Sequence, residues 1–307
     1  MQLRSIAEQT CVPSEVVVCD DGSEDETLAI LEDWKRSVPF LVRVLRNAKN
    51  LGYTKNFERA VTECRGEIIL LADHDDVWLP NRVETVCRWF ERDPELGLVT
   101  SDARLINAAG EDQGMTLREF VERMHLREFW RFFFPDDAEM VLWTGCAMAL
   151  RRRFLAPSLP IPATMACHDI WFYVTFALDS KIAFIPEPLL QYRLHGGNHS
   201  TAPTVEFLRA HPSQWHYFNA FSETLRSQHP RLMEELEAFA RSLPQTPRIE
   251  RFLRALKRHQ RHFEARGAAS VRPAGILSEI LNGGYLTHPE PIRSILYDLR
   301  EALRHGK

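Results

Sequence analysis

The sequence predicts an α/β fold, a mainly parallel sheet with flanking helices, followed by an α-helical C-terminal region. Short apolar strands alternate with amphipathic helices over residues 1–202. Two of these strands end in clusters of aspartates, and in such sheets ligands bind outside the carboxyl ends of the strands. Beyond residue 202 no strand pattern is clear and basic amphipathic helices dominate, so we expect a separate helical region over residues 203–307.

Two strand–helix units open the chain. The predicted elements are, in order, a helix over residues 2–9, a strand over 15–19, a second helix, a strand over 40–46 and a helix over 54–64. Ser23 and Glu26 have the spacing of a capping box at the start of the second helix. Leu28, Leu31 and Trp34 recur at intervals of three residues, which gives that helix an apolar side.

The same alternation continues to residue 194. The predicted elements are a strand over residues 67–72, a helix over 80–92, a strand over 97–101, a helix over 167–180 and closing strands over 182–185 and 189–194. The aromatic-rich residues 118–134 fit a core helix or a lid over the ligand crevice. The apolar segment Trp143–Leu150 contains Gly145, which indicates that its backbone passes close to another group.

Three aspartates follow the apolar strand Glu67–Ala72, namely Asp73, Asp75 and Asp76. Side chains alternate along an extended chain, so Asp73 and Asp75 can point the same way across the top of the sheet. Two carboxylates at such a short distance repel each other unless a cation lies between them. Carboxylate oxygens are ligands that suit Mg²⁺ or Mn²⁺. The alternative is a polar turn in which Asp76 caps the helix that follows Pro80.

Composition and charge exclude some classes of protein. The net charge of −4 over 307 residues predicts no general affinity for nucleic acid. The six cysteines include no C-x-x-C pair, and Cys19 and Cys64 lie in or beside apolar segments, so we expect buried, reduced thiols. The start lacks the apolar core of a signal peptide, and no run approaches the roughly 20 apolar residues of a membrane span. We therefore expect a cytoplasmic protein.

Six segments carry a family resemblance through their order and spacing. They are V-V-V-C-D-D-G-S, N-L-G-Y-T-K-N-F, I-I-L-L-A-D-H-D-D-V-W, T-G-C-A-M-A-L, H-D-I-W and Y-R-L-H. Together they resemble family 2 glycosyltransferases of the Rossmann-like GT-A fold, and most nearly the bacterial rhamnosyltransferase-like enzymes of surface polysaccharide assembly. The resemblance covers about residues 1–200. It implies transfer from a UDP- or dTDP-linked sugar, dTDP-rhamnose among the candidates, to a saccharide or lipid-linked acceptor.

The resemblance implies a donor-binding role for several polar residues. Asp20 and Asp21 match the acidic pair that holds the base and ribose, and a carboxylate can accept hydrogen bonds from both. The alternative is a turn whose acids cap a helix. Lys55 and Asn56 start a helix from which they can approach the nucleotide, although a solvated lysine fits that position equally well. Asp73 matches the first acid of the family's D-x-D and is expected near the ribose.

The remaining matches concern the metal ion and the chemistry. Asp75 matches the metal-binding acid of the D-x-D, and His195 matches the downstream histidine of the metal shell. The resemblance therefore implies that both converge on one Mg²⁺ or Mn²⁺ ion. Gly145 matches the glycine segment beside the acceptor and donor sugar, although tight packing would favour glycine too. Asp169 matches the general base, in an H-D sequence whose His168 is expected to be structural.

These matches imply a single inverting displacement. Asp169 takes the proton of an acceptor hydroxyl, which attacks the anomeric carbon opposite the diphosphate, and a bound cation neutralises charge on the leaving group. Two carboxylates acting on a glycosidic bond would instead indicate a hydrolase. By the resemblance, a D-x-D with the base much later in the chain favours transfer.

The sequence departs from the family pattern at its start. The family's first strand and loop precede the helix that begins here at Gln2, and the printed sequence contains no such segment. A misassigned start, a truncated sequence and a degenerate copy are the possible explanations. We favour a missing start because every chemical residue is intact, and we expect an open sheet edge or groove in the chain as given.

A basic amphipathic helix is expected over Ile249–Gly267. Its apolar face is formed by Ile249, Phe252, Leu253, Leu256 and Phe263. Arginines and a lysine occupy the other sides of the helix. The apolar face packs on the catalytic domain, or the helix lies peripherally on the inner face of the plasma membrane, where lipid-linked acceptors are found.

Two other functions compete with the transferase. The strand followed by D-H-D-D-V also fits haloacid-dehalogenase-like phosphohydrolases, whose first aspartate attacks phosphate. The D-D-G-S, H-D and Y-R-L-H segments are unexplained by that interpretation. The third possibility is a non-catalytic nucleotide-sugar binder, because the first strand is missing. We prefer the transferase.

Overall fold

The computed structural model describes most of the chain. The described residues are 1–123, 144–165, 167–195 and 231–269. The chain divides into two compact units, one of residues 1–120 and 142–221, the other of residues 121–141 and 222–307. The domain boundary predicted near residue 202 lies outside the described residues and stays a prediction.

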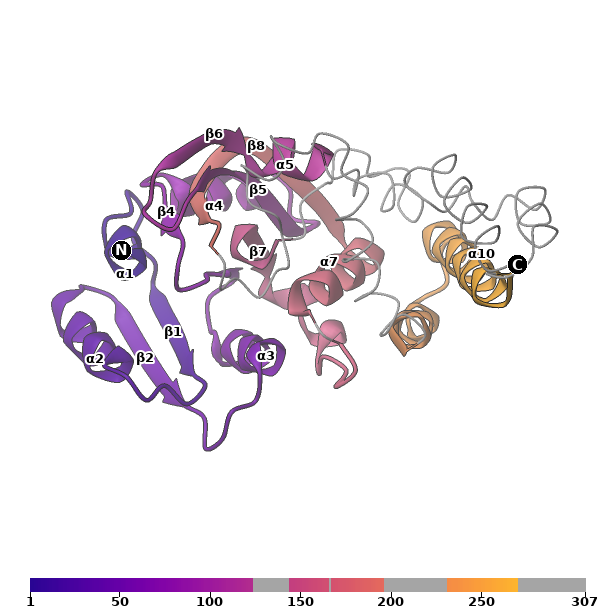
Figure 1. Ribbon diagram of the computed structural model, residues 1–307, viewed down its shortest axis with the longest axis horizontal. Helices are drawn as coiled ribbons and strands as arrows, with labels where there is room; N and C mark the ends of the chain where they lie inside the picture. The colour runs from indigo at the N-terminus through magenta and orange to yellow at the C-terminus, as the bar shows by residue number, and fades with distance from the viewer. Residues whose placement is uncertain (124–143, 166, 196–230, 270–307) are drawn as a thin grey trace, which may run out of the picture. The chain divides into compact units, whose positions relative to one another are not determined.

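The first strand–helix units form a two-stranded parallel sheet of their own (Figure 1). β1 (Glu15–Asp20) pairs in register with β2 (Leu41–Arg46). α2 (Thr27–Ser37) packs on β2, and α3 (Tyr53–Glu63) packs on β1. Within the described part of the chain β1 pairs with no strand other than β2. No other described strand therefore covers the second edge of β1.

The capping box predicted at Ser23 and Glu26 is wrong. Glu26 is the N-cap of α2 and makes no side-chain capping bond. The Ser23 amide donates to Asp20 Oδ1 at 3.2 Å, and the Thr27 amide donates to Asp25 Oδ1 at 3.0 Å. Asp25 rather than Ser23 therefore accepts a bond from the first helical amide.

The second sheet is mixed. Its strands are β3 (Ile68–Leu70), β4 (Val77–Trp78), β5 (Leu96–Ile106), β6 (Asp112–Thr116), β7 (Met148–Arg151) and β8 (Lys181–Arg193). They lie in the order β3–β7–β5–β8–β4, and β6 also pairs with β5. β5 and β8 are parallel, whereas the other pairs are antiparallel. The α/β class is thus as predicted, but this sheet is not mainly parallel.

Helices cover the mixed sheet. α4 (Arg82–Arg92) packs on β3 and β5 through a core that includes Val86 and Phe90. α7 (His168–Asp179) contacts β5 and β8, and its residues from Ile170 to Leu178 are all buried. α1 (Gln2–Ala7) contacts β4. Of the predicted aromatic helix over residues 118–134, α5 (Leu117–Arg123) covers the start and the rest lies outside the described residues.

The cysteines differ from expectation in burial. None of the six forms a disulfide. Cys19 and Cys64 are half-buried rather than buried. Cys146 is fully buried instead. Burial raises the pKa of the Cys64 thiol to about 12 and that of the Cys19 thiol above its usual range.

The second unit contains the basic helix predicted from sequence, α10 (Pro247–Ala269). Ile249, Phe252, Leu253 and Leu256 on its apolar face are buried, as are apolar residues of the helical segment 231–242. The described part of the apolar face is therefore covered by protein, while Phe263, predicted to belong to that face, lies outside the described side chains. Within the described residues, every helix is too short or too polar to cross a bilayer.

Candidate active site

The acids at the end of β1 are engaged by their own loops. Asp20 is buried, and its carboxylate accepts from the amides of Gly22 and Ser23 at 3.4 and 3.2 Å. Arg46 Nε lies 3.7 Å from Asp20 Oδ2. Gly22 has φ +101°, a left-handed conformation that glycine adopts without a steric penalty. Asp20 thus fixes the turn that leaves β1.

Asp21 holds the loop that leads into α3. Its carboxylate accepts from the amides of Leu51 and Gly52 at 2.7 and 2.9 Å and from Asn47 Nδ2 at 2.6 Å. A carboxylate offers about four acceptor positions, so the loop uses most of them. The sequence prediction missed this contact because the partners lie some thirty residues downstream.

Lys55 and Asn56 tie α3 to its surroundings. Lys55 Nζ donates to Glu58 Oε2 at 2.7 Å and to the carbonyl of Ile161. Asn56 Nδ2 donates to the carbonyl of Cys19 at 2.8 Å, which joins the helix to the C-terminal end of strand β1. Both side chains thus have structural partners, and a donor-binding role for them stays a prediction.

The turn after β3 meets the end of β8. Asp75 Oδ2 lies 2.9 Å from His195 Nε2, although the two residues are 120 positions apart in the chain. Arg193 Nε donates to the carbonyl of Asp75 at 2.8 Å and so anchors the turn to β8. The structure therefore brings together the two residues that the sequence prediction assigned to one metal ion.

Asp76 is the buried member of the same turn, with 1% of its surface exposed. Its Oδ1 accepts from the Arg193 amide at 2.9 Å. The alternative prediction, in which Asp76 caps the next helix, is wrong, because α4 has Asn81 as its N-cap. Burial raises the pKa of Asp76 to about 7. Asp76 therefore positions the end of β8 just before His195.

Asp169 lies in the first turn of α7. It accepts a bond from the amide of Ile170 at 2.8 Å, and the nearby backbone of Gly145 acts to lower its pKa. Burial, assisted by the negative charge of nearby Asp73, raises the pKa of Asp169 to about 7. A carboxyl with such a pKa can exchange protons near neutral pH, as a general base requires.

His168 is a packing residue in this structure. It is buried, and its ring stacks on Phe57 of α3 with centroids 3.9 Å apart. Burial lowers the pKa of His168 to about 3, so the imidazole is neutral. Tyr53 of α3 also lies 3.3 Å from the sulfur of Cys167. These contacts place α3, the helix beside Asp20 and Asp21, against the start of α7.

Gly145 lies in the 3₁₀ helix η2 (Gly145–Ala147), just before β7. A Cβ atom at Gly145 would lie 2.7 Å from His168 Nε2 and 3.6 Å from Asp169 Cβ. Such a distance to Nε2 is shorter than side chains tolerate, so glycine is needed for the approach of η2 to α7. Tight packing, the alternative that the sequence left open, therefore explains this glycine.

Replacing Gly145 by alanine is expected to slow catalysis more than it weakens nucleotide binding. The added methyl group must push His168, and with it Asp169, out of place, and an error of about 1 Å in a catalytic group can cost about 100-fold in rate. We expect kcat to fall roughly 10- to 100-fold. Gly66→Ala is the control, because its Cβ meets only the Ile68 carbonyl at 3.4 Å. Equal rates for the two variants would contradict this role of Gly145.

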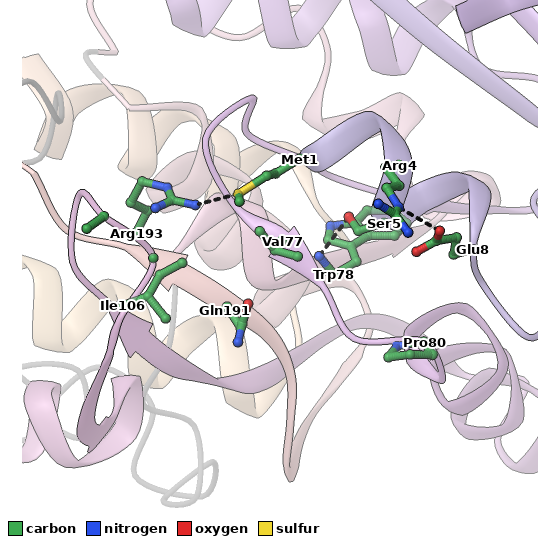
Figure 2. Close-up of a pocket in the computed structure, with 12 residues that line it drawn as sticks. Met1, Arg4, Ser5, Glu8, Val77, Trp78, Pro80, Ile106, Gln191 and Arg193 are labelled. Atoms are coloured by element: carbon green, nitrogen blue, oxygen red, sulfur yellow. Dashed lines mark hydrogen bonds and ion pairs between the residues drawn. The ribbon is translucent and has the colours of Figure 1, made fainter.

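A separate cavity of about 280 Å³ lies between α1, β4 and β8 (Figure 2). Its lining includes Arg4, Glu8 and Trp78. Arg193 also lines it, while its Nε faces the Asp75 carbonyl. No predicted site residue lines this cavity, so the acids of the candidate site face elsewhere.

Comparisons with known proteins address the fold and family. The model of "Glycosyl transferase family 2" matches residues 2–155. The uncharacterized protein Rv1520 of Mycobacterium tuberculosis is 28% identical over 194 residues, which cover 62% of this chain and 52% of Rv1520. The dTDP-rhamnosyl transferase RfbG of Shigella flexneri is 24% identical over 64% of this chain and 68% of its own. The chain spans about half the length of the first of these relatives.

Two solved structures share the fold. Staphylococcus aureus TarS 1–349, in complex with UDP-GlcNAc, has a TM-score of 0.57 and 17% identity, covering 99% of this chain and 84% of TarS. The mannosyltransferase PcManGT of Pyrobaculum calidifontis, in complex with GDP-Man and Mn²⁺, has a TM-score of 0.52 and 17% identity, covering 99% and 81%. At these identities the likeness establishes the GT-A fold and no more.

Proposed function

The chain belongs to glycosyl transferase family 2, and from that premise we propose that it is an inverting, metal-dependent glycosyltransferase. Its donor is a nucleoside-diphosphate sugar and its acceptor a saccharide or a lipid-linked saccharide of the cell surface. The rhamnosyl transferase RfbG among its relatives supports dTDP-rhamnose as the donor to test first, with UDP-linked sugars next.

The contact between Asp75 and His195 carries the proposal. A carboxylate and an imidazole from distant parts of the chain meet at 2.9 Å. Asp73, two residues before Asp75, acts electrostatically on Asp169. The Asp75–His195 contact and the electrostatic effect of Asp73 on the Asp169 carboxyl support a metal ion and a general base that act on one sugar diphosphate.

Asp169 acts as the general base. Its pKa of about 7 leaves a large fraction ionised at neutral pH, and it can then take the proton of an acceptor hydroxyl. The amide of Ile170 holds the carboxylate in place. The hydroxyl oxygen forms a bond to the anomeric carbon as the bond from that carbon to the diphosphate breaks.

Asp75 and His195 would hold the divalent cation. Their facing ligand atoms fit it chemically, because a carboxylate suits both Mg²⁺ and Mn²⁺ and imidazole is acceptable to Mn²⁺. PcManGT, with the same fold, was solved with Mn²⁺. When bound, such a cation supplies positive charge beside the leaving diphosphate. Arg193 holds the Asp75 backbone and so orients this pair.

Asp20, Asp21, Lys55, Asn56 and Asp73 are proposed to bind the donor. The first four surround the junction of β1 and α3, and α3 in turn packs against the start of α7. The side chains of Asp20, Asp21, Lys55 and Asn56 already make hydrogen bonds within the protein. We propose that they also shape the nucleotide pocket, because these bonds hold the loops around it. Asp73 reaches the ribose from the turn after β3.

The phosphohydrolase alternative is not favoured. It treats Asp73 as a nucleophile and leaves the Asp75–His195 contact without a role. The family match over residues 2–155 includes both aspartate clusters.

A donor screen tests the proposed function. Purified protein is incubated with several UDP-, dTDP- and GDP-linked sugars, with Mn²⁺, with Mg²⁺ and with chelator, and release of nucleoside diphosphate is measured. We expect hydrolysis of one donor class that depends on the metal ion. Release of phosphate from p-nitrophenyl phosphate without donor hydrolysis would contradict the proposal.

We further propose that the protein is cytoplasmic and touches anionic membrane through the basic side of α10. Five cationic side chains on this helix are exposed, namely Arg251, Arg254, Lys257, Arg258 and Arg261. Because the apolar face is buried, attraction to lipid headgroups rather than insertion would provide the binding energy.

Reversing two of these charges is expected to weaken binding to phosphatidylserine vesicles. Each basic residue near such a surface contributes about 1 kcal/mol, so Arg254→Glu with Lys257→Glu should lower the affinity roughly 30-fold or more. Co-sedimentation at low and high salt measures it. Lys35→Glu with Arg36→Glu, on exposed α2, is the matched control. An equal loss in both pairs would contradict a role specific to α10.

A further inference from the structure

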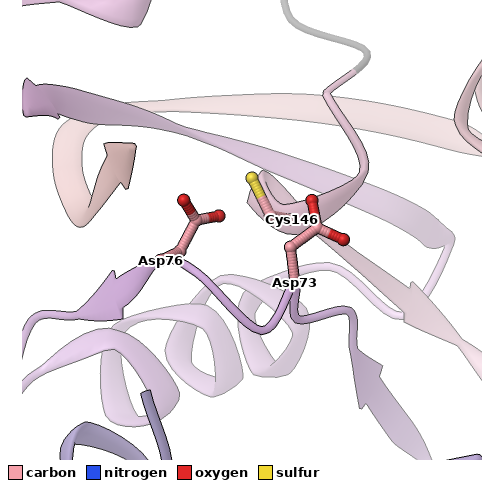
Figure 3. Close-up of side chains that lie close together, drawn as sticks. All are labelled: Asp73, Asp76 and Cys146. Carbon is pink, nitrogen blue, oxygen red and sulfur yellow. The ribbon is translucent and has the colours of Figure 1, made fainter. Parts of the chain in front are cut away.

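Asp73, Asp76 and Cys146 form a cluster beside the metal-binding pair (Figure 3). One carboxylate oxygen of each aspartate and the sulfur of Cys146 lie within 4.8 Å of one another. The aspartates come from the turn after β3, and Cys146 comes from η2 before β7. Asp76 and Cys146 are buried, whereas Asp73 is half-buried and forms the accessible side of the cluster.

Asp76 has an unused oxygen in this cluster. Its Oδ1 accepts from the Arg193 amide, but its buried Oδ2 has no partner that meets hydrogen-bond geometry. Leaving a buried polar atom unsatisfied costs about 1–3 kcal/mol. Figure 3 shows the Asp76 carboxylate and the Cys146 sulfur side by side. A cation there would satisfy this oxygen.

Arg82 is a buried cation near this cluster, and its hydrogen bonds go to the Cys146 carbonyl and to Ser101. Its guanidinium is fully buried and donates to the Cys146 carbonyl at 2.7 Å and to Ser101 Oγ at 3.2 Å. It anchors the backbone of η2, and its charge also acts on Asp76.

We propose that Asp73, Asp76 and Cys146 bind a thiophilic divalent cation of the Zn²⁺ or Cd²⁺ kind. Thiolate sulfur favours such ions over Mg²⁺, and Zn²⁺ accepts three protein ligands with a fourth position open. Ligand atoms around a tetrahedral zinc ion lie roughly 3.3–3.5 Å apart, so the ligand atoms of these side chains need to approach one another by up to about 1.5 Å. As the sulfur–metal bond forms, the Cys146 thiol releases its proton to solvent.

This site differs from the Asp75–His195 pair in its ligands and its chemistry, although Asp73 is also proposed to reach the donor ribose. The pair offers a carboxylate and an imidazole to a hard or borderline ion, whereas the cluster offers a sulfur. Binding at the cluster can be measured without any transfer reaction, so its failure would leave the proposed function untouched.

Titration of the full-length, reduced protein with Cd²⁺ tests the site. The ultraviolet charge-transfer band of a Cd²⁺–thiolate bond is the readout. We expect Cys146→Ser to lower the affinity of the site by more than the roughly 10- to 100-fold that loss of an outer-shell partner costs, and Asp76→Asn to lower it as well. Cys87→Ser, at a half-buried cysteine on α4, and His195→Ala should both keep the band.

Two results would overturn the proposal. One is the absence of a high-affinity band in the unaltered protein. The other is a Cys146→Ser variant that melts like the unaltered protein and keeps the whole band. Serine is nearly isosteric with cysteine, so the fold should survive this change.

Discussion

Asp169→Asn is expected to lower the transfer rate by about 10²- to 10⁴-fold while nucleotide binding stays within a few-fold of the unaltered protein. The amide keeps the size of the side chain but cannot take a proton from the acceptor hydroxyl. Asp169 lies in the first turn of α7, where burial raises its pKa to about 7. The substitution therefore removes a carboxyl that can accept a proton near neutral pH. Initial rates and nucleotide calorimetry on the same preparations measure both quantities.

Asp179→Asn is the matched control for this change. Asp179 is the last residue of the same helix, and burial likewise raises its pKa above its usual range. We expect this variant to retain the transfer rate. A comparable loss in both variants would show that α7 is merely sensitive to amide substitution.

The same carboxyl should set the pH dependence of the enzyme. A base must be ionised, so kcat/KM is expected to fall as pH drops through about 7, the raised pKa of Asp169. Stability has the opposite sign. A carboxyl whose pKa rises on folding stabilises the fold below its unfolded pKa of about 3.8, and this contribution is lost as pH rises through about 7. Asp169→Asn should therefore melt higher than the unaltered protein at pH 8.

Local sequence patterns predicted most helices and strands. The strands that were predicted wrongly depend on their local backbone conformation and on pairing with strands distant in the sequence. β6 was missed because D-Q-G-M-T does not alternate and Gly114 has φ +62°. β8 is one strand where two were predicted, because Pro186 and Pro188 interrupt the pattern. Its pairing with β5 shifts register between Ser101 and Asp102, opposite these prolines. Proline has no backbone N–H to donate, and the shift lets the strand continue past both prolines.

The site divides along the same line. The convergence of Asp75 and His195 was predicted because the family resemblance fixes the order of the two segments. The loop contacts of Asp21 and the burial of Asp76 were not predicted, because they depend on partners that come near only in the folded chain. No local pattern in the sequence marks Cys146 as a neighbour of two aspartates.

Asp75→Ala is expected to abolish the metal-dependent part of nucleotide binding. Loss of an outer-shell partner of a metal ligand costs roughly 10- to 100-fold in affinity, so loss of a carboxylate ligand itself should cost more. The Kd for UDP or dTDP in Mn²⁺ should then equal the value in chelator. Calorimetry of the two nucleotides in both conditions gives this comparison directly, without an acceptor.

His195→Ala should reproduce the effect in weaker form, because its imidazole meets the same point as the Asp75 carboxylate. His74→Ala is the matched control, since His74 adjoins Asp75 but is exposed and has no part in that contact. Arg193 donates a hydrogen bond to the backbone carbonyl of Asp75. The alanine variant keeps this carbonyl, so the turn should stay in place. If Asp75→Ala binds nucleotide as tightly as His74→Ala does in Mn²⁺, the cation is held elsewhere and the assignment of this pair fails.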